Sequence, residues 1–404
     1  MDIYVARQPI FDQEKKVFGY ELLFRDGINN VFSGIDGDTA TSKVLSNSFF
    51  NIGIEKLIGK GVAFINFTRE LLISQLPQLF PKEQLVIEVL EDVEAEEDVV
   101  KSCNELSRKG YSIALDDFFY SKDLKPLIEI ANIIKFDFRA TPPDEIQDIL
   151  EKLKEYNIRL LAEKVETGEE FEAALKMGFE YFQGYFFSKP EIIEGKDISP
   201  AQFNLLEIMA EVNQPYFEFS RVEQIISRDV SISYKLMRYI NSAFYKRVNE
   251  ISSIKQAIVV LGEKGIRSFL SLIAMTSLAN DKPDELVRSS IIRARFCELM
   301  HNCTDADVDS SELFTLGLFS SIDAIMNDTM ENLMEKLPLS ENLKLALVKN
   351  EGELVHYLDI AKCYERGDWK GFSRIKDKIS LNDQNLPEYF IEAITWADMI
   401  TSIK

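Results

Sequence analysis

The chain has 404 residues, of which 46% are hydrophobic and 28% charged, so we expect a globular protein of two or three domains that each bury a core. The formal net charge of −21 argues against broad nucleic-acid binding, because phosphate contacts need clusters of lysine and arginine. No apolar run approaches the length of a membrane span and the first residues lack a signal-peptide pattern, which predicts a cytoplasmic protein without a membrane partner.

Residue usage also limits the chemistry. Two histidines in the whole chain argue against imidazole-rich metal sites and a Ser-His-Asp triad, which leaves carboxylates, amides and lysines as catalytic groups. The acidity does not exclude a small phosphorylated ligand held through metal ions. Four cysteines without zinc or redox spacing are expected to be reduced thiols: Cys103, Cys297, Cys303 and Cys363.

Up to about residue 190, short apolar runs alternate with helical stretches, the pattern of βα units on a parallel sheet. The runs 4–10 and 17–24 are joined by a polar turn, which predicts an opening hairpin. Six further runs are predicted strands: 64–66, 85–89, 113–115, 133–137, 160–163 and 181–184. We therefore expect an α/β fold for this half, a closed (β/α)8 barrel of the TIM type.

Each run carries a polar or charged group within it or at its end, and a barrel would bring these groups to one mouth. They are Glu21, Asn66, Glu88, the adjacent pair Asp116 and Asp117, Lys135, Asp137, Glu163 and Gln183. Buried acids and a buried lysine are costly unless they are paired or bound to metal. Oxygen ligands without His or Cys suit Mg²⁺ or Mn²⁺, and two such ions could clamp a phosphodiester.

Taken singly, these residues also allow structural explanations. Glu21 and Glu88 could be exposed strand-edge acids, and Asp116 with Asp117 could begin a solvated loop. Lys135 could be an ion-pair partner only. The repetition at strand after strand favours one shared site.

The ordered motifs over residues 1–195 resemble the EAL domain, the cyclic di-GMP phosphodiesterase module. The matching stretches are Arg7-Gln-Pro-Ile10, Gly19-Tyr-Glu-Leu-Leu-Phe-Arg25, Phe64-Ile-Asn66, Ile87-Glu-Val-Leu-Glu91, Leu115-Asp-Asp-Phe118, Ile134-Lys-Phe-Asp137, Ala162-Glu-Lys-Val-Glu166 and Gln183-Gly-Tyr-Phe-Phe-Ser-Lys-Pro190. The resemblance implies a TIM-like barrel that uses Mg²⁺ or Mn²⁺ in a two-ion site.

The resemblance also implies a role for each matching position. The implied metal ligands are Glu21, Asn66, Glu88 and Asp116, with Asp117 serving the second ion. Lys135 matches the group that orients the attacking water, Glu163 an essential glutamate and Gln183 an active-site amide. The implied ligand-binding positions are Gln8, Leu23, Arg25 and Asp137. Physically, the guanidinium of Arg25 offers the planar fork that a phosphate or a guanine edge prefers.

Three departures from the family pattern stand out. Leu22 replaces alanine in the Glu-Ala-Leu motif, and Lys164 stands where the family has glycine. Residues 119–121, Phe-Tyr-Ser, replace Gly-Thr-Gly in a loop about two residues shorter than usual, and Phe and Tyr do not cheaply adopt glycine's backbone angles. We expect this loop to lower turnover more than affinity. In the family it also supports dimer contacts, so a homodimer is one arrangement that the resemblance implies.

After a linker at 191–200, the pattern becomes helical, which predicts an all-α domain over residues 198–404. Apolar spacings of three and four predict helices at 204–210, 231–240, 254–261, 266–278, 286–299 and 313–326, one after Pro338, and a last one that ends near Ile403. Gly262 and Gly265 bracket an expected turn between two of these helices.

The segments 241–245 and 251–262 resemble the signature of an HDOD domain, a module related to HD-type phosphohydrolases but without their metal ligands. An HD site needs a His-Asp pair, whereas Asn302 follows His301 and Tyr357 follows His356. Ser252 and Ser253 equally suit a plain helix N-cap. We expect a non-catalytic domain that contacts a protein partner.

The order of the two modules resembles the EAL–HDOD signalling proteins of bacteria. The leading hypothesis is a metal-dependent cyclic di-GMP phosphodiesterase that yields linear pGpG. A second is a receptor that binds cyclic di-GMP without cleaving it and acts on a partner through the helical domain. A third is a protein–protein scaffold with an inactive barrel. The loop after Asp117 distinguishes the first two hypotheses.

Overall fold

The computed structural model describes residues 3–26, 54–59, 61–186, 218–242, 251, 253–279, 282–304, 306, 308–337 and 339–402. The chain divides into two compact units, each of which is described by itself. One comprises Met1–Lys189 with Tyr364–Trp369, and the other comprises Pro190–Cys363 with Lys370–Lys404. Within the described residues, no helix combines the length and apolar character that crossing a membrane requires.

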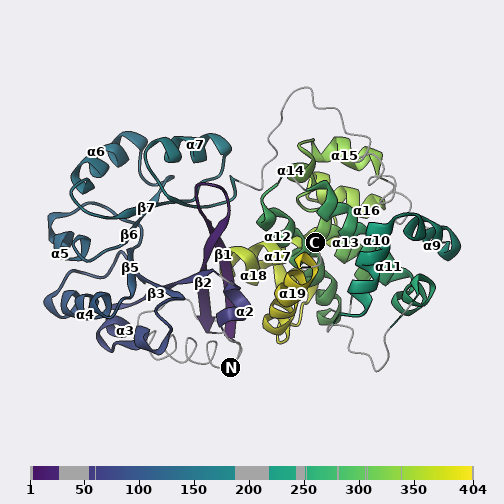
Figure 1. Cartoon of the computed structure of the whole chain (residues 1–404), viewed down its shortest axis with the longest axis horizontal. Helices are drawn as coiled ribbons and strands as arrows, with labels where there is room; N and C mark the ends of the chain where they lie inside the picture. The colour runs from purple at the N-terminus through teal and green to yellow at the C-terminus, as the bar shows by residue number, and fades with distance from the viewer. Residues whose placement is uncertain are drawn as a thin grey trace. The chain divides into compact units, whose positions relative to one another are not determined.

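The first unit is built on a closed barrel whose strands follow the chain order from β1 to β8 (Figure 1). The strands are β1 (Ile3–Phe11), β2 (Val17–Asp26), β3 (Val62–Phe67), β4 (Leu85–Val89), β5 (Ser112–Leu115), β6 (Ile133–Asp137), β7 (Arg159–Glu163) and β8 (Tyr181–Gln183). Neighbours from β2 to β8 pair in parallel, whereas β1 is antiparallel to both β2 and β8. The expected closed barrel is confirmed, with the difference that one strand runs against the others.

The reversed strand follows from the short turn between β1 and β2. Parallel strands need a crossover of a dozen or more residues, whereas a hairpin can join antiparallel strands directly. Asp12 fixes this turn, because its Oδ1 accepts hydrogen bonds from the amides of Glu14 at 3.0 Å and Lys16 at 2.9 Å. The predicted opening hairpin is therefore confirmed.

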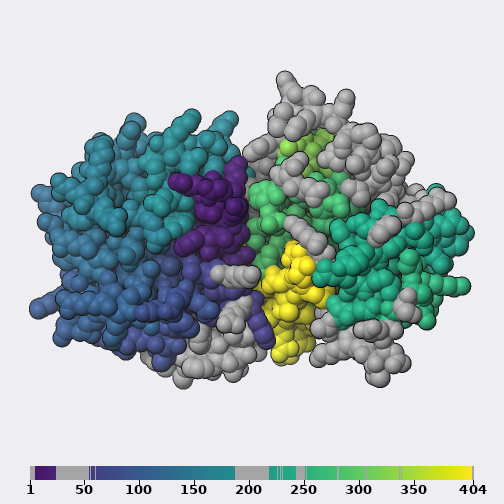
Figure 2. All heavy atoms as spheres, in the orientation of Figure 1, coloured from purple at the N-terminus to yellow at the C-terminus, as the bar shows by residue number. Residues whose placement is uncertain are grey.

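The described helices of this unit lie around the outside of the barrel (Figure 1). They are α2 (Ile54–Ile58), α3 (Arg69–Ile73), α4 (Glu97–Arg108), α5 (Lys125–Ile128), α6 (Pro143–Leu153) and α7 (Gly168–Lys176). The spaces between these ribbons are filled by side chains in the space-filling view (Figure 2). Thr167 begins α7 with a capping box, since its side chain accepts from the Glu170 amide and the Glu170 carboxylate accepts from the Thr167 amide.

An apolar layer fills the barrel interior: Ile10, Phe64, Val86, Ala114, Ile133, Leu161 and Tyr181. Side chains two positions apart along a strand face the same side of a sheet. Six residues therefore lie one layer nearer the carboxyl ends of the strands: Asn66, Glu88, Asp116, Lys135, Glu163 and Gln183. Because β1 runs in the opposite direction, its residue in this second layer lies two positions before Ile10 in the sequence and is Gln8. The apolar layer is thus the floor on which the polar residues stand.

The second unit is helical. Its described helices are α9 (Phe219–Arg228), α10 (Val230–Ile240), α11 (Ile254–Leu278), α12 (Asp284–Met300), α13 (Ser310–Phe319), α14 (Ile322–Met326), α15 (Met330–Lys336), α16 (Glu341–Lys344), α17 (Leu354–Arg366), α18 (Trp369–Lys376) and α19 (Leu386–Thr401). The predicted all-α class of this half is confirmed. The expected helix at 204–210 and the residues 403–404 lie outside the described part of the chain.

Two helices are interrupted at glycine or serine residues, and only the first of these breaks was predicted. Gly262 has φ 66° and ψ −176°, and this left-handed residue breaks α11 at the expected turn, whereas Gly265 is helical. The single helix predicted over 313–326 is in fact two, α13 and α14, because Ser320 and Ser321 interrupt it. Ser253 caps α11, because its side chain accepts a hydrogen bond from the Gln256 amide at 3.2 Å. The helix N-cap predicted for this position is therefore confirmed.

Candidate active site

Lys135 lies at the centre of four carboxylates inside the barrel. Its Nζ is 2.6 Å from Glu88 Oε1, 2.7 Å from Asp116 Oδ1, 2.9 Å from Glu163 Oε1 and 3.7 Å from Glu21 Oε2. The side chains of Lys135 and Glu88 are fully buried. The structure thus brings five of the sequence-predicted site residues into one cluster.

The strand register places these residues side by side. Asn66 on β3 is the direct partner of Glu88 on β4, and Asp137 on β6 is the direct partner of Glu163 on β7. Gln8 is the partner of Glu21 across the opening hairpin. The other site residues are shifted in register, since Glu88 pairs with Ala114 and Lys135 with Leu161. Each parallel strand nevertheless carries an inward residue near its carboxyl end, so residues far apart in the sequence meet at one mouth.

Amide side chains hold Glu21 in place. Asn66 Nδ2 donates to Glu21 Oε1 at 3.2 Å, and Gln183 Nε2 donates to Glu21 Oε2 at 2.7 Å. The same Gln183 nitrogen also donates to Gln8 Oε1 at 2.8 Å. Gln183 and Gln8 therefore join the cluster through Glu21, although neither contacts Lys135 directly.

Asp116, Asp117 and Glu163 form a second grouping, in which one carboxylate oxygen of each lies within 4.8 Å of the others. Both aspartates reach this point because the chain turns sharply at Asp117, which has a left-handed φ of 37°. The turn is anchored on both sides, since the Asp116 amide donates to Val89 O at 3.0 Å and the Phe118 amide to Lys135 O at 3.1 Å.

Burial sets the protonation of the cluster. Burial raises the pKa of Glu88 well above its ordinary value and that of Glu163 to about 8. Burial and the neighbouring Asp116 raise the pKa of Asp117. Burial alone would lower the pKa of Lys135, but the surrounding carboxylates outweigh it and hold that pKa well above its ordinary value. Without a metal ion, the cluster therefore keeps a charged lysine and retains a proton on its acids.

The oxygen atoms of the cluster fit hard metal ions. Within the described part of this cluster, six buried oxygens accept no hydrogen bond. Two of them, Glu88 Oε1 and Asp116 Oδ1, form ion pairs with Lys135, and the other four are Asn66 Oδ1, Glu88 Oε2, Asp117 Oδ1 and Gln183 Oε1. Buried polar atoms without a partner are rare, and each points to a ligand or a functional role. Carboxylate and amide oxygens are the ligands that Mg²⁺, Mn²⁺ and Ca²⁺ prefer.

The predicted ligand-binding residues are placed less completely. Leu23 is half-buried on β2, and the backbone of Arg25 pairs with Tyr4, but the side chain of Arg25 lies outside the described part of the structure. Asp137 is held within the protein, because its Oδ1 accepts from the amides of Arg139 at 2.7 Å and Ala140 at 3.1 Å. These bonds and the Lys164 ammonium lower the pKa of Asp137, although its burial opposes this.

The loop after Asp117 has ordinary backbone angles at Phe119 and Tyr120. Within this described loop, Asp117 alone has a positive φ, so neither Phe119 nor Tyr120 takes the backbone angles reserved for glycine. Phe118 is buried and packs edge-on against Phe136, whereas the Phe119 and Tyr120 side chains are exposed. The ordinary angles of the loop agree with the expectation that Phe and Tyr do not adopt glycine's backbone angles, and the effect of the loop on turnover stays a prediction. A small pocket of about 80 Å³ beside the acid pair is lined in part by Leu115, Phe118 and Phe119.

Sequence reasoning did not place Lys164 in the site. Lys164 has a left-handed φ of 56°, and its Nζ forms an ion pair with Asp137 and lies 3.9 Å from Asp117 Oδ1. The signal was present in the sequence, because a lysine directly follows Glu163 where the EAL pattern has glycine.

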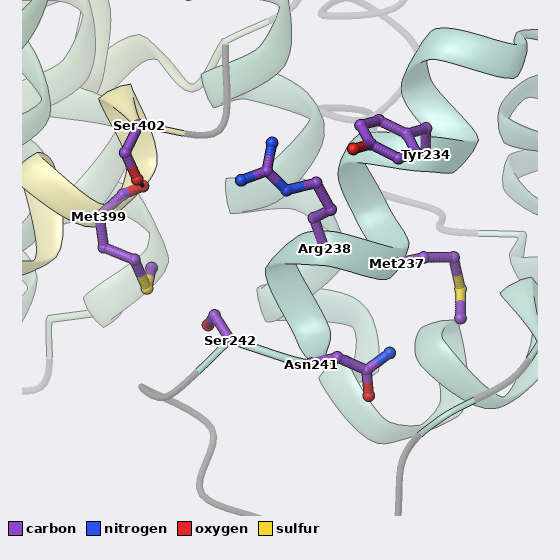
Figure 3. Close-up of a pocket in the computed structure, with 7 residues that line it drawn as sticks. All are labelled: Tyr234, Met237, Arg238, Asn241, Ser242, Met399 and Ser402. Carbon is purple, nitrogen blue, oxygen red and sulfur yellow. Dashed lines mark hydrogen bonds between the residues drawn. The ribbon is translucent and has the colours of Figure 1, made fainter.

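The helical unit has a pocket of about 480 Å³. It is lined by Tyr234, Met237, Arg238, Asn241, Ser242, Met399 and Ser402, which come from α10 and the two residues after it and from the last turn of α19 and the residue after it (Figure 3). The Arg238 side chain extends toward the space between these two helix ends (Figure 3). Asn241 closes the loop after α10, since its side chain exchanges two hydrogen bonds with the backbone of Ile251 at 2.8 and 2.9 Å.

Comparison with family models and curated proteins gives matches over both units. The EAL domain model matches residues 39–190, and the HDOD domain model matches residues 200–358. The cyclic di-GMP phosphodiesterase CdgJ of Vibrio cholerae is 38% identical over 403 residues, which cover 99% of this chain and 93% of that protein. The YuxH protein of Bacillus subtilis is 36% identical over 412 residues, which cover 100% of both chains.

Solved structures of EAL proteins also align with part of this chain. A Bacillus subtilis YkuI protein with an EAL domain, in complex with substrate c-di-GMP and calcium, aligns with a TM-score of 0.40 and 18% identity over 64% of this chain and 73% of that chain. A standalone EAL protein from Vibrio cholerae in its c-di-GMP-bound form aligns with a TM-score of 0.37 and 26% identity over 46% of this chain and 92% of that chain.

Proposed function

Because the chain belongs to the EAL–HDOD family of two-domain proteins, we propose that its barrel is a metal-dependent phosphodiesterase that hydrolyses cyclic di-GMP to linear pGpG. The relative CdgJ, which carries that activity in its name, is 38% identical over 99% of this chain. In the reaction, one water adds across one of the two phosphodiester bonds, a P–O bond breaks, and a hydroxyl group and a phosphate monoester result.

The observation that carries the proposal is the cluster around Lys135. Four carboxylates have an oxygen within 3.7 Å of the Lys135 ammonium group. Ionised carboxylates buried together are destabilising unless they share a cation. We propose that Glu21, Asn66, Glu88 and Asp116 hold one Mg²⁺ or Mn²⁺ ion. A second ion would be held by Asp117, with Asp116 and Glu163 beside it. When bound, such ions lower the pKa of an attacking water and balance the charge that develops on the phosphodiester.

The residues of the chain divide the remaining work. In the metal-free protein the surrounding carboxylates hold the pKa of Lys135 well above its ordinary value, and a protonated Lys135 would donate a hydrogen bond to an attacking water. In the metal-free protein, burial raises the pKa of Glu163 to about 8, so Glu163 holds a proton near neutral pH until an ion binds beside it. Gln183 positions Glu21 and Gln8 through its amide nitrogen. Gln8, Leu23, Arg25 and Asp137 form the proposed binding positions for the dinucleotide.

The helical unit is proposed to be non-catalytic and to contact a protein partner in the cytoplasm. Neither histidine is followed by aspartate, so the paired ligands of an HD-type metal site are missing from the sequence. A homodimer is a further proposal, which rests on the family role of the loop after the acid pair.

A receptor that binds cyclic di-GMP without cleaving it remains the second candidate. The observation that favours it is the altered loop, in which the exposed Phe119 and Tyr120 replace the family's Gly-Thr. Hydrolysis needs its groups held within about half an ångström of the productive geometry, whereas binding tolerates looser placement.

One experiment separates the two candidates. Purified full-length protein is incubated with cyclic di-GMP and Mg²⁺ or Mn²⁺, pGpG is followed by chromatography, and binding is measured by calorimetry in Ca²⁺. The phosphodiesterase predicts metal-dependent pGpG that is lost in Glu88→Gln. Binding without any pGpG supports the receptor, and the absence of both activities overturns each of them. Glu94→Gln, an exposed acid in the same βα loop, is the matched control.

A further inference from the structure

Lys164 is a cation built into the edge of the acid cluster. Its Nζ forms an ion pair with Asp137 Oδ2 and lies 3.9 Å from Asp117 Oδ1. Lys164 comes directly after Glu163, the last residue of β7, and the left-handed backbone at Lys164 redirects the chain at this point. Lysine adopts this conformation at a cost in free energy, which glycine avoids.

The two acids beside Lys164 differ in how freely they can move. Asp137 is fixed by two backbone amides, so it holds the ammonium group at a defined place. Asp117 has no such anchor: its Oδ1 is buried, accepts no hydrogen bond from the described residues, and lies only within ion-pair distance of Lys164. Asp117 also belongs to the grouping with Asp116 and Glu163 that could hold a metal ion.

The singly charged ammonium group of Lys164 therefore lies beside Asp117 Oδ1, an oxygen that the second divalent ion would need. A charge at this distance in a partly buried site repels another cation strongly, since the effective dielectric constant is well below that of water. The side chain of Lys164 is half-exposed at 51%, so its flexible stem can leave the site when a stronger competitor arrives.

We propose that Lys164 competes with the second divalent ion for Asp117 and thereby makes metal loading sequential. This inference rests on the proposed two-ion phosphodiesterase. The first ion, held by Glu21, Asn66, Glu88 and Asp116, binds without this competition, because none of these four residues forms an ion pair with Lys164 in the described structure. The second ion binds only when it displaces the ammonium group, so Lys164 is a positioning residue that sets the ion concentration needed for turnover.

The test is a Mn²⁺ titration of full-length protein by calorimetry, with electron paramagnetic resonance to detect a coupled Mn²⁺ pair. Lys164→Met removes the charge and keeps the length of the side chain. This variant should bind the second Mn²⁺ ion at least tenfold more tightly than the wild type does. Its affinity for the first ion should stay within twofold of the wild-type value. Lys164→Gly should change the two affinities in the same way as Lys164→Met. Glycine also suits the left-handed backbone at this position, so the comparison separates the effect of charge from that of backbone strain.

Two controls keep the charge argument specific. Lys164→Arg retains the cation and should titrate as the wild type does. Arg139→Met removes one positive charge from the neighbouring loop, where Arg139 pairs with Glu166 rather than with the cluster, and it should change neither ion.

The outcomes separate this inference from the proposed function. If the affinity for the second ion is the same in wild type, Lys164→Met and Lys164→Gly, the proposed competition is overturned. The proposed phosphodiesterase is not affected by that result. An equal gain of second-ion affinity in Arg139→Met would show a general charge effect and would also overturn it. No binding of Mn²⁺ to any variant would overturn the inference and the proposed function together.

Discussion

Lys135 Nζ lies 2.6 Å from Glu88 Oε1, and both side chains have no exposure to solvent. A buried ion pair contributes little net stability, because removing two charges from water costs about as much as their attraction returns. Removing one partner is different, since the other charge is left buried and uncompensated. Ile133 and Val86 of the apolar layer lie two positions before Lys135 and Glu88 on the same two strands. The strands that form the core therefore also fix the position of this ion pair.

Lys135→Met should destabilise the metal-free protein by about 3–5 kcal/mol, because Glu88, Asp116 and Glu163 then share no cation. Divalent ions should restore part of this loss, as they bind the folded state only. Urea unfolding with and without Mn²⁺ measures both effects. Lys125→Met, which removes an exposed surface ion pair with Glu129, is the control and should change stability by less than about 1 kcal/mol. Equal stabilities for the two variants would show that the cluster does not depend on Lys135.

Glu88→Gln should abolish binding of the first divalent ion while the barrel stays folded. The neutral amide keeps the shape of Glu88 and removes the charge that an oxygen-ligated ion requires. Mn²⁺ calorimetry gives the affinity, and circular dichroism with the melting temperature reports the fold. Glu94→Gln serves as the control. An unchanged Mn²⁺ affinity in Glu88→Gln would leave Glu88 with a structural role only.

Most of the barrel could be predicted from sequence, because strand ends with polar residues recur at regular intervals. The floor residues Phe64, Val86 and Ile133 belong to the same short runs as Asn66, Glu88 and Lys135, and a period of two places them on one face. The arrangement around Lys135 could not be read in this way, since it depends on how far each strand is shifted relative to its neighbour.

The turns after the strands were less predictable than the strands. The left-handed residues Asp117 and Lys164 were not predicted from the sequence. Backbone angles in a loop depend on anchors such as the hydrogen bond from the Phe118 amide to Lys135 O, which joins residues that are distant in sequence. The division between α13 and α14 was missed for a related reason, because the apolar spacing continues across Ser320 and Ser321.

Metal affinity should depend on pH through Glu163. Burial raises the pKa of Glu163 from 4.5 to about 8, so below pH 8 the metal-free site carries a proton that a bound ion must displace. The affinity for Mn²⁺ should therefore fall by up to about tenfold for each pH unit below 8 and level off above it. Calorimetry in buffers of different ionisation enthalpy counts the released proton. Equal affinities at pH 6.5 and 8.5, with no proton release, would contradict the prediction.

The thiols of Cys103 and Cys303 should be unreactive in the folded protein. Burial raises the pKa of each to about 11, and only the thiolate is the nucleophile. At pH 8, labelling with a maleimide followed by peptide mass spectrometry should leave both unmodified until urea unfolds the chain. Rapid labelling of either cysteine in the native protein would show that its surroundings open to solvent.

The last prediction concerns the loop between Phe118 and Leu124. Asp117 ends a sharp left-handed turn, and the residues after it expose Phe119 and Tyr120 rather than packing them. The Tyr120 ring lies 4.8 Å from Lys152 Nζ, a contact that holds the loop toward α6. Because both ions and the water must be placed closely for hydrolysis, we expect slow cleavage beside measurable binding of cyclic di-GMP.

Replacing residues 119–123 with the family's longer glycine loop should raise the rate of pGpG formation at least tenfold, a fall of about 1.4 kcal/mol in the barrier. The affinity for cyclic di-GMP should barely change, because Gln8 and Leu23 lie on the opening hairpin and not in this loop. The double variant Phe119→Ser with Tyr120→Ser is the matched control, since it removes the exposed rings and keeps the loop length. Turnover and calorimetric affinity are measured for all three proteins. If the control gains as much as the graft, the exposed rings limit turnover. If the wild type already cleaves at a rate that the graft does not improve, this loop does not limit the reaction.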